Sequence, residues 1–386
     1  MKKKSFNIFV LLVYAVVFYI QYILLVSNFS TLFEESESFS DGIYYLLLDS
    51  ICTLLIIYYI LGRGIRLPGT FMCLLLFVLI QVVFLCIGNR SFDYIMRLHS
   101  WAFLLIGGYG YLVCHPAQSF ILKEYVSLGL IALTLILIYQ ETLARGAYSI
   151  ESGLNVIYWV LLGFPFAFIT KSKFLKWGLV ITIGFAVLLS LKSTAILAYV
   201  SALAVSVIIS NRVSSRHRWI YITLLVIVFS VWSYLSDYLF SAFGVSWEAK
   251  IQQSLETSGS GRSVIWGQVI SMISSSNVYQ LLFGHGHDSV FKVLQFSAHN
   301  DFLEVLYDYG LFAFMFYVAV YIKIIIDLRR MIRERYPYST ALAVSLVVFL
   351  IVSFYSHLVI YPGLLLNLAV FWAIVYSTWK TTQQTL

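Results

Sequence analysis

Long apolar runs separated by short polar breaks recur along almost the whole chain, and they limit the fold to one that sits in a bilayer. A helix of roughly 17–22 apolar residues matches the thickness of the hydrocarbon core. Twelve such runs cover residues 7–27, 42–61, 69–88, 98–114, 124–140, 154–170, 177–191, 194–210, 219–237, 309–327, 339–356 and 361–379. We therefore predict an all-α polytopic membrane protein with about 12 transmembrane helices.

Composition agrees with this prediction. The chain is 61% hydrophobic and 11% charged, with a mean hydropathy of +0.88. A soluble domain has about 45–50% apolar and about 25% charged residues. The first apolar run follows a basic start and has no small-residue cleavage site, so we expect a retained first helix.

The distribution of Lys and Arg predicts the orientation. With the N-terminus inside, 18 of the 25 basic residues fall on the cytoplasmic side. The other seven are Arg90, Arg97, Arg145, Lys192, Lys250, Arg262 and Lys292. We expect a multi-pass protein of the cell inner (plasma) membrane with both termini cytoplasmic. This bias accounts for the net charge of +7, so no nucleic-acid partner is needed.

The same topology divides the chain into three parts. Residues 1–237 form a nine-span bundle, residues 238–308 form a large, helical outer loop, and residues 309–386 hold the last three spans and a cytoplasmic tail. The outer loop is the only long segment of the sequence whose composition does not suit the interior of a bilayer. Since the outside offers no nucleotide supply, a reaction there needs a substrate that is already activated and carried on lipid.

Arg262 is the first candidate catalytic residue in this loop. Ser258-Gly-Ser-Gly leads into a predicted amphipathic helix that presents Val264, Ile265, Val269, Met272 and Ile273 to the membrane or to the bundle. A cation in the first turn of a helix is unfavourable unless an anion is bound nearby. Trp266, one turn on, is suited to stacking on the guanidinium or on a sugar. The alternative is a solvated surface arginine.

His299 is the second candidate catalytic residue. Asn300 is a good N-cap for a helix that continues into the tenth span, which places the imidazole near the lipid headgroups. A histidine there suits proton abstraction from a hydroxyl near neutral pH. The alternative is a core histidine bonded to a carbonyl.

Two further patterns in the loop have competing interpretations. His285, His287 and Asp288 offer metal-type donors, but the glycines around His285 favour a backbone turn that approaches a ligand, and we predict no metal. Asp301, Glu304 and Asp308 form an acidic stripe, for which we expect a solvated face. The alternative for the stripe is a divalent-ion or general-base site.

Cations near the outer membrane surface are candidates for binding an anionic substrate because the outer loops are otherwise poor in Lys and Arg. These are Lys192, Arg145, Arg90 and Arg97, of which Lys192 stands out at the tip of a tight helical hairpin. Asn300, His285 and Tyr361 are weaker candidates for substrate contacts.

The order SGRSVIWGQVI, LLFGHG and SAHNDFLEVLYDYGLF resembles the C-terminal region of the O-antigen ligase and polymerase superfamily. The motifs cover about 55 residues, and the span count and loop position extend the resemblance over the chain. Ligases of this family carry GxxG nine residues after the HN pair. Here Gly310 matches and Ala313 replaces the second glycine. An arginine of the family, near spans seven and eight, is replaced by Lys192.

The resemblance implies an inverting, metal-independent glycosyltransferase that needs no cofactor, with the multi-span fold called GT-C. Its donor is a glycan on polyprenyl pyrophosphate. In that scheme Arg262 contacts the pyrophosphate and His299 activates the acceptor hydroxyl. The implied partners are lipid-linked oligosaccharides, membrane lipid and a chain-length regulator.

Three functions remain open. A polymerase joins two lipid-linked repeat units, and the missing glycine with Lys192 favours this interpretation. An O-antigen ligase transfers the finished glycan to lipid A-core. A flippase or transporter is less favoured, because we find no internal repeats or matched broken spans. A structural partner of an export complex would not need Arg262 or His299.

Overall fold

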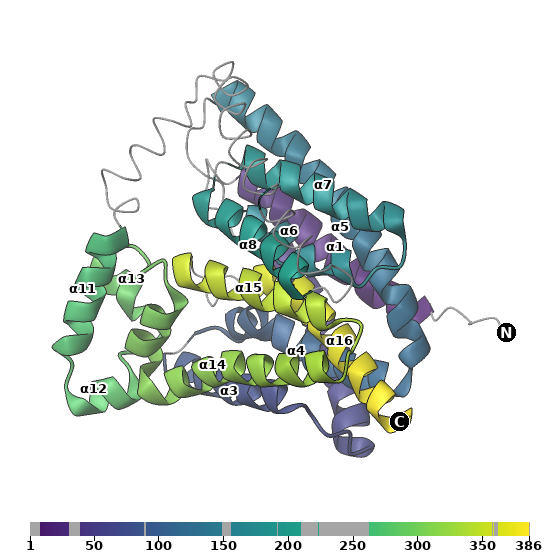
Figure 1. The fold of residues 1–386 in the computed structure, drawn as a ribbon. Coiled ribbons are helices and arrows are strands. Elements are labelled where there is room, and N and C mark those ends of the chain that lie inside the picture. The colour runs from purple at the N-terminus through teal and green to yellow at the C-terminus, as the bar shows by residue number, and fades with distance from the viewer. Residues whose placement is uncertain are drawn as a thin grey trace.

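The computed structural model describes residues 8–30, 39–88, 90–148, 156–190, 192–209, 223, 262–356, 358 and 362–385. Throughout these residues the regular elements are helices (Figure 1), so the all-α prediction is confirmed.

The N-terminal half of the protein supplies five long helices. They are α1 (Ile8–Ser30), α2 (Phe39–Leu55), α3 (Gly69–Ile87), α4 (Phe92–Cys114) and α5 (Pro116–Tyr148). A π-helix over Ile56–Gly62 extends α2. Pro68 precedes the first residue of α3, and the side chain of Ser91 caps α4 by accepting the backbone N–H of Tyr94.

A short buried helix and a hairpin follow. They comprise α6 (Ile157–Leu161), a 3₁₀ turn (Phe164–Phe168), α7 (Lys173–Leu189) and α8 (Ser193–Ile209). Helix α7 ends at Leu189 and α8 begins at Ser193, inside the predicted break at Lys192-Ser193-Thr194, so the interval forms two helices and the predicted hairpin is confirmed. The expected ninth span, 219–237, lies outside the described residues.

The C-terminal part begins with a compact helical segment. It contains α11 (Arg262–Ser274), α12 (Val278–Phe283) and α13 (Ser289–Leu294). The long helix α14 (Asp301–Arg333) follows, then α15 (Ser339–Tyr355), a 3₁₀ turn (Pro362–Leu365) and α16 (Leu366–Thr385). In Figure 1 the segment α11–α13 lies at one end of α14, far from the C-terminus.

Five helical stretches are long and apolar enough to cross a membrane: Ile43–Gly62, Gly69–Ile87, Pro116–Leu143, Asp301–Arg333 and Gly363–Gln383. Shorter apolar helices accompany them at Ile8–Ile23, Leu98–Cys114, Ile157–Phe168, Ser193–Ile209 and Ser339–Tyr355. These helices fit a membrane protein.

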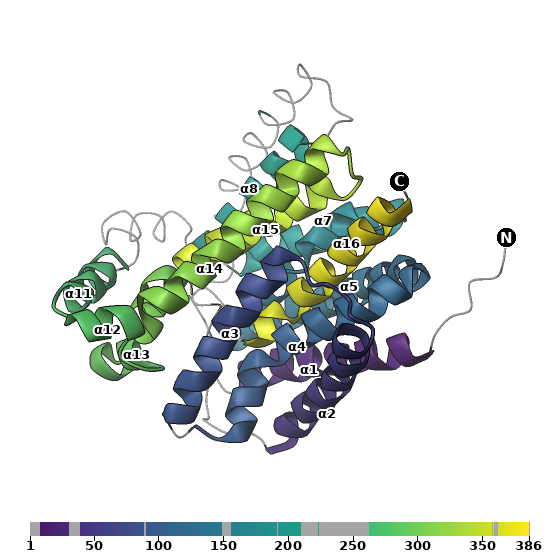
Figure 2. The ribbon, with the colours of Figure 1, turned by 90° about the horizontal axis from the view of Figure 1, so that it is seen from below.

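Helix α16 forms the centre of the bundle. Its candidate span is 94% buried, and Trp372 and Tyr376 are almost fully enclosed. Helix α16 packs on α4, α4 also packs on α2, and α3 packs along α14 (Figure 2). Because α16 is mostly apolar from Leu368 to Tyr376 and is enclosed by its neighbours, it is a scaffold on which the outer helices rest.

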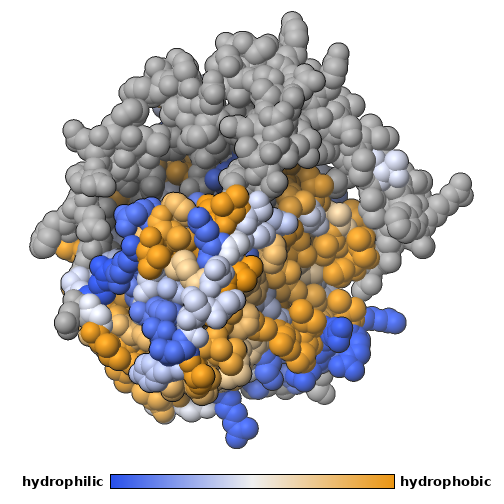
Figure 3. Space-filling view, turned by 90° about the vertical axis from the view of Figure 1, so that its left-hand side faces the viewer, coloured by the Kyte–Doolittle hydropathy of each residue, from blue (hydrophilic) through white to orange (hydrophobic). Residues whose placement is uncertain are grey.

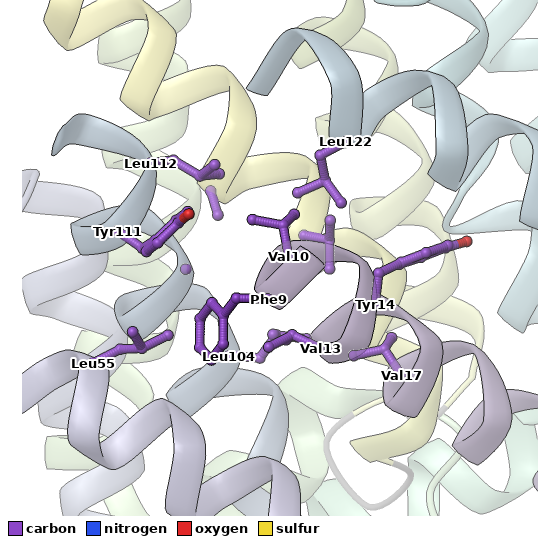
Figure 4. Close-up of a pocket in the computed structure, with 13 residues that line it drawn as sticks. Phe9, Val10, Val13, Tyr14, Val17, Leu55, Leu104, Tyr111, Leu112 and Leu122 are labelled. Carbon is purple, nitrogen blue, oxygen red and sulfur yellow. The ribbon is translucent and has the colours of Figure 1, made fainter. Parts of the chain in front are cut away.

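An apolar cavity of about 60 Å³ opens between α1, α2, α4, α5 and α16 (Figure 4). Phe9, Val13, Leu104 and Leu122 are among its walls, and its lining contains no Lys, Arg, His, Asp or Glu. Such a space can hold apolar chains but offers no acid, base or cation for chemistry.

Candidate active site

The end of the molecule that carries α11–α13 differs from the apolar bundle. Figure 3 shows hydrophilic and hydrophobic residues side by side on this face. Val269, Val290, Ala298 and Tyr307 form a small buried cluster that joins α11 and α13 to the first part of α14. The segment is therefore packed against the bundle.

The contact face of α11 agrees with the predicted one except at one position. Val269 is fully buried, and Ile265, Met272 and Ile273 pack around the same cluster. Val264 is 63% exposed, so it does not share this contact with the bundle, and its predicted contact with the membrane stays a prediction. The reason is that α11 turns a narrow stripe toward α14, and Val264 lies outside it.

The HN pair is built around the start of α14. The side chain of Asn300 accepts the backbone N–H of Leu303 at 3.2 Å, so Asn300 is the N-cap. The backbone N–H of Ala298 donates to Oε1 of Glu304 at 2.9 Å. Between these two anchors His299 is held at φ 51°, a left-handed conformation that is uncommon for residues with a side chain. Strained conformations of this kind persist where the surrounding structure fixes them, often at functional sites.

The imidazole of His299 is half-buried and lies in the field of two cations. Burial, followed by the positive charges of Arg262 and Lys192, lowers its pKa from 6.5 to about 4. His299 is therefore neutral at pH 7. Lys192 lies in the turn between α7 and α8, Arg262 at the start of α11, and His299 just before α14. Three separate segments of the chain therefore contribute to this electrostatic interaction.

Arg262 is the first residue of α11, as the sequence predicts, and it also reaches α8. Its Nη1 atom lies 3.5 Å from the hydroxyl of Thr194, a long hydrogen bond. Thr194 is buried, and the hydroxyl of Tyr158 on α6 lies beside Thr194 and Ser356 in the field of Arg262. Three hydroxyl side chains thus surround the region where Arg262 meets the bundle.

Trp266 connects α11 to the residue before His299. Its indole N–H donates to the carbonyl of Ala298 at 2.9 Å. The ring packs edge-on against Phe354, with ring centroids 5.5 Å apart. It also contacts Tyr355 in a tilted arrangement, with ring centroids 6.1 Å apart. Because Trp266 holds the backbone beside the imidazole, its position bears directly on the geometry of the site.

The Gly284-His285-Gly286 turn approaches the α14 backbone. The N–H groups of His285 and Gly286 donate to the carbonyls of Tyr307 and Asp308 at 3.0 and 2.8 Å. Helix α14 kinks at Gly310, where φ is 77°. The ring of His285 stacks on Tyr307 and bonds to Ser276 at 2.8 Å. The glycines therefore allow two stretches of protein backbone to meet, whereas we expected a turn that meets a ligand.

Arg90 is engaged with Asp288 through an ion pair of 2.8 Å. His287 lies beside this pair, with Nε2 2.9 Å from the hydroxyl of Tyr94 and Nδ1 2.5 Å from that of Tyr309. Burial alone would raise the pKa of Asp288, but the hydrogen bond and charge of His287, with Arg90, lower it below its ordinary value. This cluster fastens the α3–α4 connection to α13.

The acidic stripe on α14 is buried, so the prediction of a solvated face is wrong. Asp301 is 0% exposed, Glu304 4% and Asp308 3%. Asp301 accepts the hydroxyl of Tyr317 at 3.0 Å, and Asp308 accepts the backbone N–H of Val290 at 3.0 Å. Asp308 and Glu304 fasten α13 and the loop before α14 to this helix, whereas the bond from Tyr317 to Asp301 lies within α14. Within the described part of the chain, no three His, Cys, Asp or Glu side chains converge on a metal site.

Three predicted substrate contacts cannot be placed. The side chains of Arg97 and Arg145, and all of Tyr361, lie outside the described residues. The structure brings together His299, Arg262, Lys192 and Trp266, with Asn300 as the cap beneath them. Thr194, Tyr158 and Ser356 were not predicted. The only signal for them was the hydroxyl-containing break at Ser193 and Thr194.

The fold and this site define a helical membrane protein with a cationic, histidine-containing site where the packed segment α11–α13 meets the bundle. Residues 178–318 match the family model described as O-antigen ligase. The match runs from α7 to the middle of α14 and includes Lys192, Arg262, Trp266 and His299, and it confirms the resemblance to the O-antigen ligase and polymerase superfamily. No curated protein matches the chain.

Proposed function

We propose that this protein is a polysaccharide polymerase for O-antigen or capsule. It transfers a growing glycan from polyprenyl pyrophosphate to a hydroxyl of an incoming lipid-linked repeat unit on the outer face of the membrane. The observation that carries the proposal is the neutral imidazole of His299 in the field of Arg262 and Lys192. Transfer of a sugar from a pyrophosphate requires a base on one side and cations on the other.

In the proposed reaction the acceptor oxygen attacks the anomeric carbon of the donor sugar. The bond from that carbon to the pyrophosphate oxygen breaks, and the configuration inverts. His299 takes the proton of the acceptor hydroxyl. Arg262 and Lys192 stabilise the negative charge that grows on the departing polyprenyl pyrophosphate.

Donor binding strengthens the base in this scheme. In the free protein burial, and after it the two cations, hold the pKa of His299 low. A bound pyrophosphate offsets both positive charges and so raises this pKa toward its ordinary value. His299 thus becomes more basic only when a donor is in place, which disfavours proton transfer in an empty site.

The proposal includes the fold of the whole bundle, which we propose has about twelve membrane-spanning helices in the arrangement of the inverting GT-C glycosyltransferases. Two features favour a polymerase over a ligase. Ala313 replaces the second glycine of the ligase motif and is fully buried among other core side chains. Lys192 supplies a point charge where the family has an arginine fork, so recognition of the pyrophosphate at this position differs.

The test uses a host strain in which the chromosomal gene is deleted and each variant is supplied in trans. We expect Arg262→Ala and His299→Ala to insert normally and to abolish chain extension. Arg329→Ala, an exposed cation at the far end of α14, is the matched control and retains full-length glycan. Normal polymer from both site variants contradicts the assignment. In the deletion strain, a single repeat on the acceptor supports a polymerase, and long chains left on the lipid carrier support a ligase.

A further inference from the structure

A second cavity, which is polar, lies at the other end of α14 from His299. Its volume is about 160 Å³, roughly ten times the 10–15 Å³ that a cavity needs to hold one water molecule. Asp327 and Arg330 of α14 line it, together with the start of α3 and the end of α16, near the C-terminus in Figure 1. About 29 residues of helix separate it from the candidate active site, or roughly 40 Å at 1.5 Å per residue.

Three cations from three separate segments surround this cavity. Arg66 precedes α3, Arg330 is in the last turn of α14, and Lys380 is on α16. Within the described residues none of the three forms an ion pair with a carboxylate. Lys323 lies close by, with its terminal atoms 3.6 Å from the place where a Cβ on Gly69 would be. Like charges gathered in this way repel one another unless an anion joins them.

The nearby carboxylates do not neutralise the cluster. Asp327 faces the interior, where Oδ2 accepts the hydroxyls of Thr70 at 2.8 Å and Tyr376 at 3.1 Å. Glu334, one helical turn after Arg330, accepts the indole N–H of Trp379 at 2.7 Å. Both acids are held by neutral donors and keep their own negative charge. Asp327 is the one carboxylate among the lining residues, against three cations, so the cavity keeps an excess of positive charge.

The start of α3 adds to the positive field. Pro68 is its N-cap residue and provides no side-chain cap, and no acidic residue lies in the first turn. The free N–H groups at a helix N-terminus favour an anion. Tyr109, Tyr376 and Trp379 form aromatic walls of the cavity, and aromatic residues of this kind are common at the depth of lipid headgroups.

We propose that this cavity, lined by Arg66, Arg330 and Lys380, binds a phosphate group on the side that the charge distribution predicts to be cytoplasmic. Two sources share this chemistry: the headgroup of an anionic phospholipid and a soluble phosphate. Basic pockets between membrane helices on the cytoplasmic side are suited to anionic headgroups. The site is separate from the proposed glycan chemistry and does not depend on it.

The test titrates purified full-length protein with phosphatidylglycerol or phosphatidylcholine and follows bound lipid by native mass spectrometry. A second arm titrates sodium phosphate at constant ionic strength and follows the melting temperature. The variant is Arg66→Gln with Arg330→Gln. Its control, Arg329→Gln with Arg333→Gln, removes the same charge from exposed positions of α14 that do not line the cavity.

We expect the wild type and the control to bind anion alike. At about fivefold per charge, the cavity variant binds roughly 25-fold more weakly. Loss in the lipid arm identifies a headgroup, and loss confined to the phosphate arm identifies a soluble anion. Equal binding by the cavity variant and the control in both arms overturns the proposal. If the double variant does not fold, Lys380→Gln is compared with Arg333→Gln in the same way.

Discussion

The backbone nitrogen of Gly284 lies against the α-carbon of Gly310 so closely that no Cβ atom fits between them. The two glycines come from different motifs, LLFGHG and YDYGLF, and both have positive φ, 80° and 77°. Their contact lets the turn after α12 donate two hydrogen bonds to the carbonyls at the α14 kink. The segment α11–α13 is thereby fixed to the helix that begins beside His299.

Gly310→Ala tests this contact. A Cβ there would lie 2.5 Å from the carbonyl oxygen of Leu282, and alanine is disfavoured at this φ. We expect a loss of about 2–4 kcal/mol of stability from strain and overpacking, with reduced glycan synthesis. Thermal unfolding of the purified protein measures the change. Gly267→Ala, where a Cβ meets open space within α11, is the control and should be neutral or slightly stabilising.

Local signals in the sequence were enough to predict parts of this site. The polar break at Lys192 predicted the α7–α8 hairpin, and Asn300 before an apolar run predicted the start of α14. Both predictions depend on a few neighbouring residues. Arg262 in the first turn of α11 was predicted for the same reason.

Tertiary partners could not be predicted in this way. The spacing of Asp301, Glu304 and Asp308 places them on one helix face, but it does not say whether that face meets water. The face is covered by α13 and by the loop before α14. The N–H of Val290 in α13 donates to Asp308, and the N–H of Ala298 in the loop donates to Glu304. The meeting of Thr194 with Arg262 likewise depends on a contact between segments 68 residues apart.

The pH dependence of catalysis should report the charges around His299. Because the neutral imidazole is required, we expect the acid limb of kcat/KM in wild type near pH 4, the value to which burial and the two cations lower the pKa. Lys192→Gln removes one cation, so the pKa rises and the acid limb moves to higher pH. Lys292→Gln removes the same charge at an exposed position and leaves the limb in place. An unmoved limb in Lys192→Gln contradicts the electrostatic link.

The same lowered pKa predicts a change in stability. The ordinary pKa of His299 is 6.5, and folding lowers it to about 4, so the unfolded chain binds more protons between these values. The contribution of His299 to stability is complete above pH 6.5 and is lost as the pH falls toward 4. Melting temperatures of wild type and His299→Gln should therefore converge or cross as the pH is lowered from 7 to 4. Parallel curves would argue against a lowered pKa.

Trp266 is expected to position the backbone next to His299, and two substitutions separate this role from sugar stacking. Trp266→Phe keeps an aromatic ring beside Phe354 but loses the hydrogen bond to the carbonyl of Ala298. A lost hydrogen bond of this kind weakens the fold by about 1 kcal/mol. We expect a lower kcat with KM nearly unchanged in Trp266→Phe, and a larger loss of both stability and kcat in Trp266→Ala. A rise in KM alone for Trp266→Phe would instead indicate contact with the substrate.

Arg90 can be tested for substrate binding by a double-mutant cycle with Asp288. The two side chains are 39% and 20% exposed, and an ion pair this open contributes about 0.2–1 kcal/mol. If Arg90 acts only as an anchor for α13, Arg90→Ala lowers stability slightly, and adding Asp288→Ala costs only what Asp288 contributes through His287. Activity then follows stability in all three variants. If Arg90 also binds the anionic donor, Arg90→Ala raises KM several-fold, and Asp288→Ala alone does not. The two roles are distinguished by steady-state rates with a lipid-linked repeat unit, measured together with melting temperatures. The ion pair is lost in either single variant, whereas a contact with the donor is lost only when Arg90 is replaced.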